Sequence, residues 1–183
     1  VSLDTWEKRG PVNDVYRISD LIEDDKPVIV NYCDFYMTWN WQDFKETVLD
    51  NQCEGAIPCY TGFHPHLIPD YNLYASCKVN EEKFLLEIRE KYSFETDKKK
   101  GFHSVGTYYF KRGDILKESF KWLMDTEQSL NGEYYVSMAY NYLVQKNLKT
   151  YIYDKVDHFC QWGTPEDLKE YLFWVNRICK GVT

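Results

Sequence analysis

The chain has 183 residues, with 22 Lys and Arg against 29 Asp and Glu, and a formal net charge of −7. Its composition, 44% hydrophobic and 17% aromatic, excludes disorder as the main state and predicts a single domain over residues 1–183. No run approaches the ~20 apolar residues of a membrane span. The acidic balance argues against nucleic acid as the main partner, because binding it needs clustered Lys and Arg. A local cationic site for a small phosphate ligand stays open.

The six cysteines include no Cys-x-x-Cys pair, which excludes zinc-ribbon and thioredoxin-like sites. Several lie in apolar or aromatic runs, where a free thiol behaves as a small buried hydrophobic group. No signal peptide is recognisable, so a reducing cytoplasm is the expected compartment, although an even cysteine count also permits disulfides. The sequence opens at Val1 rather than Met, from which we expect a further piece upstream.

The first predicted elements are two strands and a helix. Residues 26–35 form a β-branched apolar run that reaches Asp34, which predicts a buried strand with an acid at its C-terminal end. A helix is expected over residues 39–48, because its apolar side chains share one face. Residues 56–60 form a second apolar run, in which Pro58 predicts an edge or irregular strand.

The middle of the chain predicts mainly antiparallel structure. Residues 74–79 and 84–89 flank a polar turn, the pattern of a β-hairpin. The lysine-rich residues 96–100 predict a mobile loop. A further strand is expected over residues 104–110, broken at Gly106, and Asp114 is expected to cap the helix that follows.

Three more elements complete the predicted order. A helix is expected over residues 133–144 and a strand over residues 148–153. The last helix has the clearest start, because Thr164 is a good N-cap, Pro165 fits the first helical position and Asp167 follows the cap by three residues. An apolar stripe continues it at Leu168, Leu172 and Val175. The mixture of strands and helices predicts an α/β class with antiparallel hairpins.

Asp34 is the first candidate for chemistry. Ligands of open α/β sheets bind just beyond the carboxyl ends of strands. An acid at such a position can hold Mg²⁺, which in turn bridges phosphate oxygens. A helix cap or a surface acid is the alternative interpretation.

Two further positions carry charges at the ends of predicted elements. Lys91 closes a strand and can neutralise a phosphate, while its neighbour Glu90 can accept hydrogen bonds from sugar hydroxyls. An ordinary solvated ion pair is the alternative. Glu133 opens a helix and can bind a polyol, but an acid in a first turn also simply complements the helix dipole.

The histidines give no metal site. His64 and His66 are too few for a closed zinc site, so a structured loop near a site is the preferred interpretation. His103 and His158 lie beside aromatic residues, which predicts hydrogen-bonded histidines in the core or at its rim. No nucleophilic triad can be assigned, since triads assemble in space.

Five segments occur in an order that resembles the sugar-1-phosphate nucleotidylyltransferases, and most closely a bacterial branch found with capsule and surface-polysaccharide genes. The segments span residues 26–171 and read VIVNYCDFY, GFHPHL, EIREKYSF, SVGTYYF with NGEYYVS, and FCQWGTPEDLKEY. The resemblance implies a GT-A-like, Rossmann-related α/β/α sandwich with a mixed central sheet. It also implies a cytoplasmic enzyme that uses Mg²⁺ to join an NTP and a sugar 1-phosphate, or a related phosphate ester, into an NDP-sugar and pyrophosphate. Neither nucleic acid nor a membrane is an implied partner.

The resemblance also implies residue roles. Asp34 is similar to the family's Mg²⁺-binding acid. Glu90 and Lys91 resemble its Glu-Lys pair, in which the lysine contacts the sugar phosphate and the acid contacts the sugar. Gly106 resembles the glycine that lets the sugar approach the backbone, and Glu133 the acid that contacts sugar hydroxyls.

Two departures from the family pattern accompany this resemblance. Nothing before Lys26 resembles the family's glycine-rich G-x-G-x-R loop, so we expect the N-terminal part of the nucleotide half to be missing and the chain alone to be inactive. The strand at residues 26–35 should then expose an apolar edge and favour a homo-oligomer. The second departure is Gln161, which stands where many relatives carry a second metal-binding Asp. Either Asp157 substitutes, or phosphate oxygens complete the metal's shell.

Two other functions stay open. A truncated remnant could bind a sugar phosphate or a partner without catalysis. A GT-A glycosyltransferase would use a ready-made NDP-sugar, but such enzymes commonly carry an Asp-x-Asp metal motif, whereas residues 34–36 here read Asp-Phe-Tyr.

Overall fold

The computed structural model describes residues 9–180, and within them a seven-stranded mixed sheet forms the centre of the molecule. The strands run in the order β1-β7-β3-β6-β4-β5, and β8 pairs with β3 in parallel. Their bounds are β1 Val28–Asn31, β3 Gly55–Tyr60, β4 Ser76–Val79, β5 Leu85–Arg89, β6 Phe102–Ser104, β7 Thr107–Phe110 and β8 Thr150–Tyr153.

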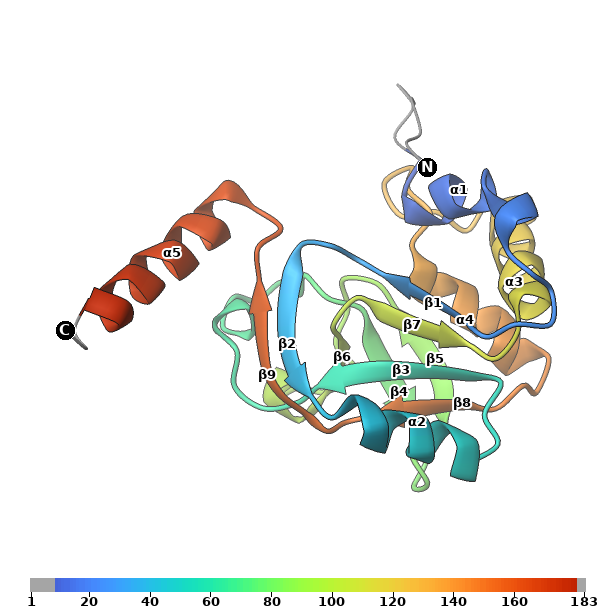
Figure 1. The fold of residues 1–183 in the computed structure, drawn as a ribbon, viewed down its shortest axis with the longest axis horizontal. Helices are drawn as coiled ribbons and strands as arrows, with labels where there is room; N and C mark the ends of the chain where they lie inside the picture. The colour runs from blue at the N-terminus through green and yellow to red at the C-terminus, as the bar shows by residue number, and fades with distance from the viewer. Residues whose placement is uncertain (1–8, 181–183) are drawn as a thin grey trace.

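A separate antiparallel ribbon of β2 and β9 lies at one end of this sheet, and the C-terminal helix α5 extends beyond the ribbon, away from the rest of the chain (Figure 1). The ribbon consists of β2 Phe35–Trp39 and β9 Val156–Gln161. The helices are α1 Pro11–Tyr16, α2 Trp41–Asp50, α3 Gly113–Asp125, α4 Val136–Gln145 and α5 Pro165–Lys180. No helix in the described part of the chain is long and apolar enough to cross a membrane.

Apolar layers cover both faces of the main sheet. Ile57 of β3 and Ile152 of β8 pack into the larger layer, which α1, α3 and α4 complete. Their neighbours Ala56 and Tyr153 pack into a smaller layer with Phe44 of α2. Successive residues of a strand point to opposite faces, so two buried faces require an apolar residue at nearly every position. The α/β/α sandwich with a mixed sheet is therefore confirmed.

The predicted interior strand over residues 26–35 is wrong. Strand β1 ends at Asn31 and pairs only with β7 among the described strands, so it lies at an edge of the sheet. The chain then bends, and Asp34 lies in this bend rather than at a strand end. The reason is that residues 35–39 leave the sheet and pair with β9 instead. Ile29 of this edge strand is exposed and Val30 is buried, and the expected association through the edge stays a prediction.

Pro58 does not mark an edge strand. Strand β3 is interior, with β8 on one side and with β7 and β6 on the other. Pro58 lies between Ala56, the last residue paired with β7, and Cys59, the first paired with β6. The ladder changes partner at this point, and a residue without an N–H group is tolerated where a ladder is interrupted.

Two other local expectations differ from the structure. The lysine-rich residues 96–100 contain a short 3₁₀ turn, and the Lys98 ammonium is held there by the backbone carbonyls of Pro69 and Tyr71. These contacts hold the segment in place, so the expected mobile loop is wrong. Asp114 does not cap α3, because Arg112 is the N-cap residue and Asp114 lies in the first turn.

The remaining predicted elements are present with shifted ends. The hairpin β4–β5, the break between β6 and β7 at Gly106, helix α4, strand β8 and helix α5 all occur. Thr164 caps α5, since its hydroxyl oxygen accepts from the Asp167 N–H and its O–H donates to the Asp167 carboxylate. Strand β9 was not predicted. Its sequence has few β-branched residues, and only the pairing with β2 defines it as a strand.

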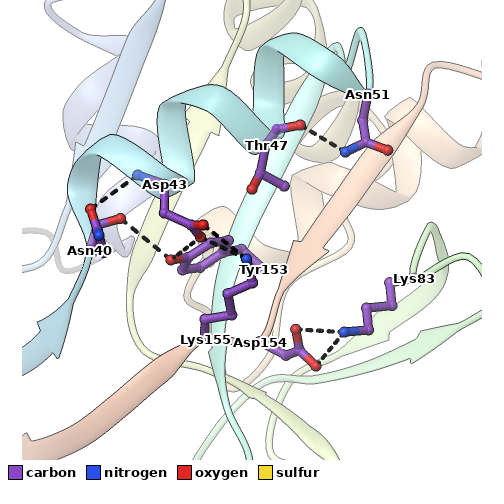
Figure 2. Close-up of polar contacts among 8 residues, drawn as sticks. All are labelled: Asn40, Asp43, Thr47, Asn51, Lys83, Tyr153, Asp154 and Lys155. Carbon is purple, nitrogen blue, oxygen red and sulfur yellow. Dashed lines mark hydrogen bonds and ion pairs between the residues drawn. The ribbon is translucent and has the colours of Figure 1, made fainter.

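Helix α2 is fixed to the chain between β8 and β9 by a polar cluster (Figure 2). Asn40 caps α2 by accepting from the Asp43 N–H at 3.0 Å. The Asp43 carboxylate in turn accepts from the Tyr153 hydroxyl at 2.9 Å and from the Lys155 ammonium. These two hydrogen bonds, that from Lys155 first, lower the pKa of Asp43. Lys83 and Asp154 form a second ion pair nearby.

Candidate active site

A pocket of about 170 Å³ opens where the ribbon meets the main sheet. Segments far apart in the sequence form its walls: the bend after β1, the residues that follow β5, the β6–β7 connection, the start of α4 and the end of β9. The lining includes Tyr32, Asp34, Phe35, Glu90, Lys91, Gly106, Tyr135, Phe159 and Gln161. The structure therefore brings four of the predicted site residues, and the predicted metal-ligand position 161, to one cavity.

The ribbon forms the first wall, around Asp34. Phe35 pairs with Gln161 across the β2–β9 ladder, and the Trp162 N–H donates to the Asp34 carbonyl at 2.8 Å. A Cβ atom added to Gly163 would lie 2.8 Å from the Gln161 amide nitrogen and 3.1 Å from an Asp34 carboxylate oxygen. Both side-chain ends therefore lie beside the space that a Cβ atom of Gly163 would fill, and only a glycine leaves that space open.

This wall suits a hard cation only in part. Magnesium is commonly bound by one or two carboxylates together with substrate phosphates and water, and Asp34 supplies one carboxylate. Gln161 adds an amide next to it. Asp157 does not line the pocket, because it lies four residues earlier on β9, about 13 Å away along the strand. Within residues 9–180 there is no group of three or more His, Cys, Asp or Glu that could hold a metal ion.

The main sheet forms the opposite wall, around Glu90 and Lys91, which follow β5. The Glu90 carboxylate accepts a short hydrogen bond from the hydroxyl of Ser137, a fully buried residue in α4. Burial raises the pKa of Glu90, and the Ser137 hydrogen bond opposes that rise only in part. Lys91 is exposed and has a φ of +50°, a left-handed conformation that is uncommon for residues other than glycine. Such conformations often occur at functional sites.

Tyr135 contacts both Glu133 and Lys91, two of the residues predicted to bind the acceptor. Its hydroxyl donates to the Glu133 carboxylate at 2.6 Å, and its ring lies 5.6 Å from the Lys91 ammonium. Burial, and then the hydrogen bond to Glu133, raise the pKa of the Tyr135 hydroxyl. Glu133 itself does not line the pocket and reaches it only through Tyr135. A lysine over an aromatic face is held by the ring's quadrupole.

Gly106 lies at the floor between the two walls. Its φ of +94° suits glycine, and a Cβ atom there would approach the rings of Tyr32 and Phe35 at 3.1 and 3.3 Å. The rings of Tyr32 and Phe35 therefore pack closely against the Gly106 backbone, and all three residues line the pocket. Burial, followed by the charge of Glu90, raises the pKa of Tyr32.

Sequence reasoning missed Ser137 and Tyr135. Both lie in the segment NGEYYVS, from which only Glu133 was singled out. No spacing rule links Ser137 to Glu90, because their contact joins α4 to the end of β5 across 47 positions. The signal that could have drawn attention to Tyr135 is its place beside a helix start that already carries a candidate acid.

The histidines behave as expected for a structured loop. His64 caps a short turn by accepting from the His66 N–H, and His66 contacts the Tyr74 hydroxyl at 2.9 Å and the Asp167 carboxylate at 3.0 Å. His103 is buried and hydrogen-bonded to the carbonyl of Lys98. His158 is exposed, with Cys160 Sγ at 3.1 Å.

The cysteines of the described chain are free. Cys53, Cys59 and Cys77 are buried, as expected of small hydrophobic groups, whereas Cys33 is exposed and Cys160 partly buried. The side chain of Cys179 lies outside the described part of the structure.

Comparison with solved structures identifies the fold. A nucleoside-diphosphate-sugar pyrophosphorylase from Vibrio cholerae superposes with a TM-score of 0.70 at 18% identity, over 93% of this chain and 67% of that protein. A Bacillus anthracis protein assigned as a glucose-1-phosphate thymidylyltransferase, in complex with sucrose, gives 0.66 at 13% identity, over 91% and 61%. The sequence matches no protein-family model and no curated protein.

These similarities establish a shared Rossmann-like α/β fold with two nucleotidyltransferases. At such identities the fold alone is shown. The chain spans 67% of the first protein and less than two thirds of the second.

Proposed function

We propose that this chain is part of a sugar-1-phosphate nucleotidylyltransferase, which joins an NTP and a sugar 1-phosphate into an NDP-sugar and pyrophosphate for surface-polysaccharide synthesis. The observation that carries the proposal is the convergence of Asp34 and Lys91 on one pocket. Two nucleotidyltransferases with the same fold support it. The resemblance in five ordered segments points the same way.

The two walls suit the two halves of this reaction. An oxygen of the sugar phosphate forms the new bond to the α-phosphorus of the NTP, while the bond from that phosphorus to the bridging oxygen breaks and pyrophosphate leaves. Such transfer depends on positioning and on neutralising charge, more than on covalent help from the protein. Asp34, beside Gln161, would hold a Mg²⁺ ion, which would supply part of that neutralisation.

The main-sheet wall holds the acceptor in this proposal. Lys91 contacts the phosphate of the sugar phosphate, and Glu90, fixed by Ser137, accepts hydrogen bonds from the sugar hydroxyls. The Gly106 backbone, which lines the pocket, contacts the sugar ring. Tyr135 holds the Lys91 ammonium near its ring at the pocket, and Glu133 acts on the acceptor through Tyr135 rather than directly.

The test combines turnover and binding. A complete enzyme that contains this chain is incubated with each NTP, a series of sugar 1-phosphates and Mg²⁺, and pyrophosphate release is measured. Titration calorimetry of the same chain with the sugar 1-phosphates measures acceptor binding directly. We expect binding of at least one sugar 1-phosphate and release that requires both substrates.

Each rival function gives a different result. A non-catalytic binding protein binds the sugar phosphate without releasing pyrophosphate. A glycosyltransferase consumes an NDP-sugar and shows no NTP-dependent release. If no sugar 1-phosphate binds and none supports pyrophosphate release, the proposal is overturned.

A further inference from the structure

Helix α5 carries large apolar side chains that its own chain leaves uncovered. The contacts described for this helix are in its first turns: Asp167 contacts His66 at 3.0 Å, and the ring of Tyr171 lies 4.9 Å from that of Trp162. Further along, Trp174 is 55% and Ile178 is 65% exposed. A helix of 16 residues has little stability in water unless its apolar face is packed against something.

The exposed face borders an open groove of about 590 Å³ between α5 and the body of the protein. Tyr171, Trp174 and Ile178 follow the helical spacing i, i+3, i+7, so they form one stripe along this groove. The facing wall is also apolar in part, because it includes Tyr60 and Phe63, of which Phe63 is 62% exposed. Both walls are therefore suited to receive an amphipathic helix.

The charges beside the stripe indicate which amphipathic helix fits the groove. Glu170 and Arg177 lie seven residues apart, so they occupy the same flank of the stripe, two turns from each other. No ion pair is recorded for either of them in the described part of the chain. In an antiparallel pair of identical helices, the same flanks face each other, which brings Glu170 of each copy to Arg177 of the other. In a parallel pair this flank would face the opposite flank of the partner helix, at Val175, and would gain no ion pair.

We propose that a second copy of this chain covers the groove, with the two α5 helices packed antiparallel about a two-fold axis near Trp174. The contact is self-complementary, as a two-fold interface requires. It also reaches the pocket region, because Phe159 and Gln161 line both the groove and the pocket. This dimer uses a different surface from the apolar edge of β1.

Sedimentation equilibrium on the intact chain tests the proposal at concentrations from about 1 to 100 μM. We expect a mass of two 22.0 kDa chains for the wild type. Trp174→Glu should weaken the dimer at least a hundredfold, since it buries a charge at the centre of the contact. The matched control is Leu49→Glu, which places the same charge at an exposed leucine on α2, near the edge of β1. It should leave the dimer intact.

Charge reversal tests the antiparallel arrangement separately. Glu170→Arg alone and Arg177→Glu alone should each weaken the dimer about tenfold, and the double variant should recover wild-type association. Circular dichroism confirms that each variant keeps its helices. A monomeric wild type at 100 μM overturns the proposal, and so does dissociation by Leu49→Glu but not by Trp174→Glu. Failure of the double variant to recover association overturns the antiparallel pairing.

Discussion

The two walls of the pocket are built in different ways. The wall around Glu90 and Lys91 belongs to the main sheet and α4, where a fully buried serine fixes the carboxylate. The wall around Asp34 and Gln161 belongs to a two-stranded ribbon, and both side chains end in open space beside Gly163. The sheet wall adjoins the larger apolar layer, whereas the ribbon wall combines its ladder hydrogen bonds with a small apolar cluster that includes Phe35, Val156 and Phe159.

This difference fits the two tasks of the proposed reaction. A sugar is recognised by hydrogen bonds in fixed directions, and these benefit from groups that are already oriented. A metal ion with phosphates brings its own geometry and needs fewer protein ligands. Substitutions in the ribbon wall should therefore change turnover, whereas substitutions in the sheet wall should change acceptor binding and stability.

The largest expected effect is that of Asp34→Ala on turnover. Removing the only carboxylate of the ribbon wall should lower kcat about a thousandfold, because the charge on the α-phosphate is no longer neutralised. The thermal midpoint should stay unchanged, since Asp34 is exposed. Steady-state pyrophosphate release measures kcat. Asp157→Ala, at the far end of β9, is the matched control and should match wild type; near-normal turnover of Asp34→Ala would remove Asp34 from the proposed role.

Lys91→Ala should weaken binding of the sugar 1-phosphate, whereas Asp34→Ala lowers turnover. Loss of a charge-assisted contact of ~2 kcal/mol raises the Kd for a sugar 1-phosphate about 30-fold. Titration calorimetry gives this Kd. Lys100→Ala, which removes an exposed lysine outside the pocket, should bind like wild type. Equal losses in both variants would point to a general charge effect.

Gly163→Ala should lower turnover about tenfold, because the added methyl displaces the Gln161 amide and approaches the Asp34 carboxylate. Stability should change by less than about 0.5 kcal/mol, since both neighbours are ends of flexible side chains. Kinetics and thermal melts measure the two effects. Adding Gln161→Ala should restore part of the turnover, because it removes the side chain that the new methyl group displaces. If the double variant instead loses as much turnover as the two single variants together, this account is contradicted.

Glu90→Gln should make the protein more stable while it weakens sugar binding. The raised pKa of Glu90 means that ionising this carboxyl costs more in the folded than in the unfolded protein. Wild-type stability therefore falls as pH rises through that raised pKa, and the glutamine variant avoids the loss. Melts from about pH 4 to pH 8 should show the two proteins diverging as pH increases. A glutamine variant that is less stable at neutral pH would contradict the burial argument.

The smallest expected effect is that of Asp43→Asn, which lies outside the pocket. The pKa of Asp43 is lowered by Lys155 and Tyr153, so its stabilising contribution is present at neutral pH and is lost as pH falls through the lowered pKa. The variant should be slightly less stable than wild type at neutral pH and equal to it in strong acid. Chemical denaturation at the two pH values measures this; turnover should be unaffected.

Much of the fold followed from the sequence because its signals are local. The cap at Thr164, the hairpin turn between β4 and β5 and the break at Gly106 each depend on a few neighbouring residues. Strand β9 and the edge position of β1 were missed, since both depend on which distant strand pairs with them.

The sequence predicted only those site residues that lie in recognisable segments. Asp34, Lys91 and Gly106 were named from their segments, and the structure places them around one pocket. Ser137 and Tyr135 were not, because a hydroxyl becomes relevant only once the fold brings it to Glu90 or to Lys91.

Strand β3 sends alternate residues into both apolar layers, Ala56 to one and Ile57 to the other. Inserting or deleting one residue there would exchange the two sets of side chains and place each in a layer of the wrong volume. Lengthening is better tolerated in surface connections such as residues 126–129. Natural variants of this protein should therefore keep the length of this strand constant and differ in length in its loops.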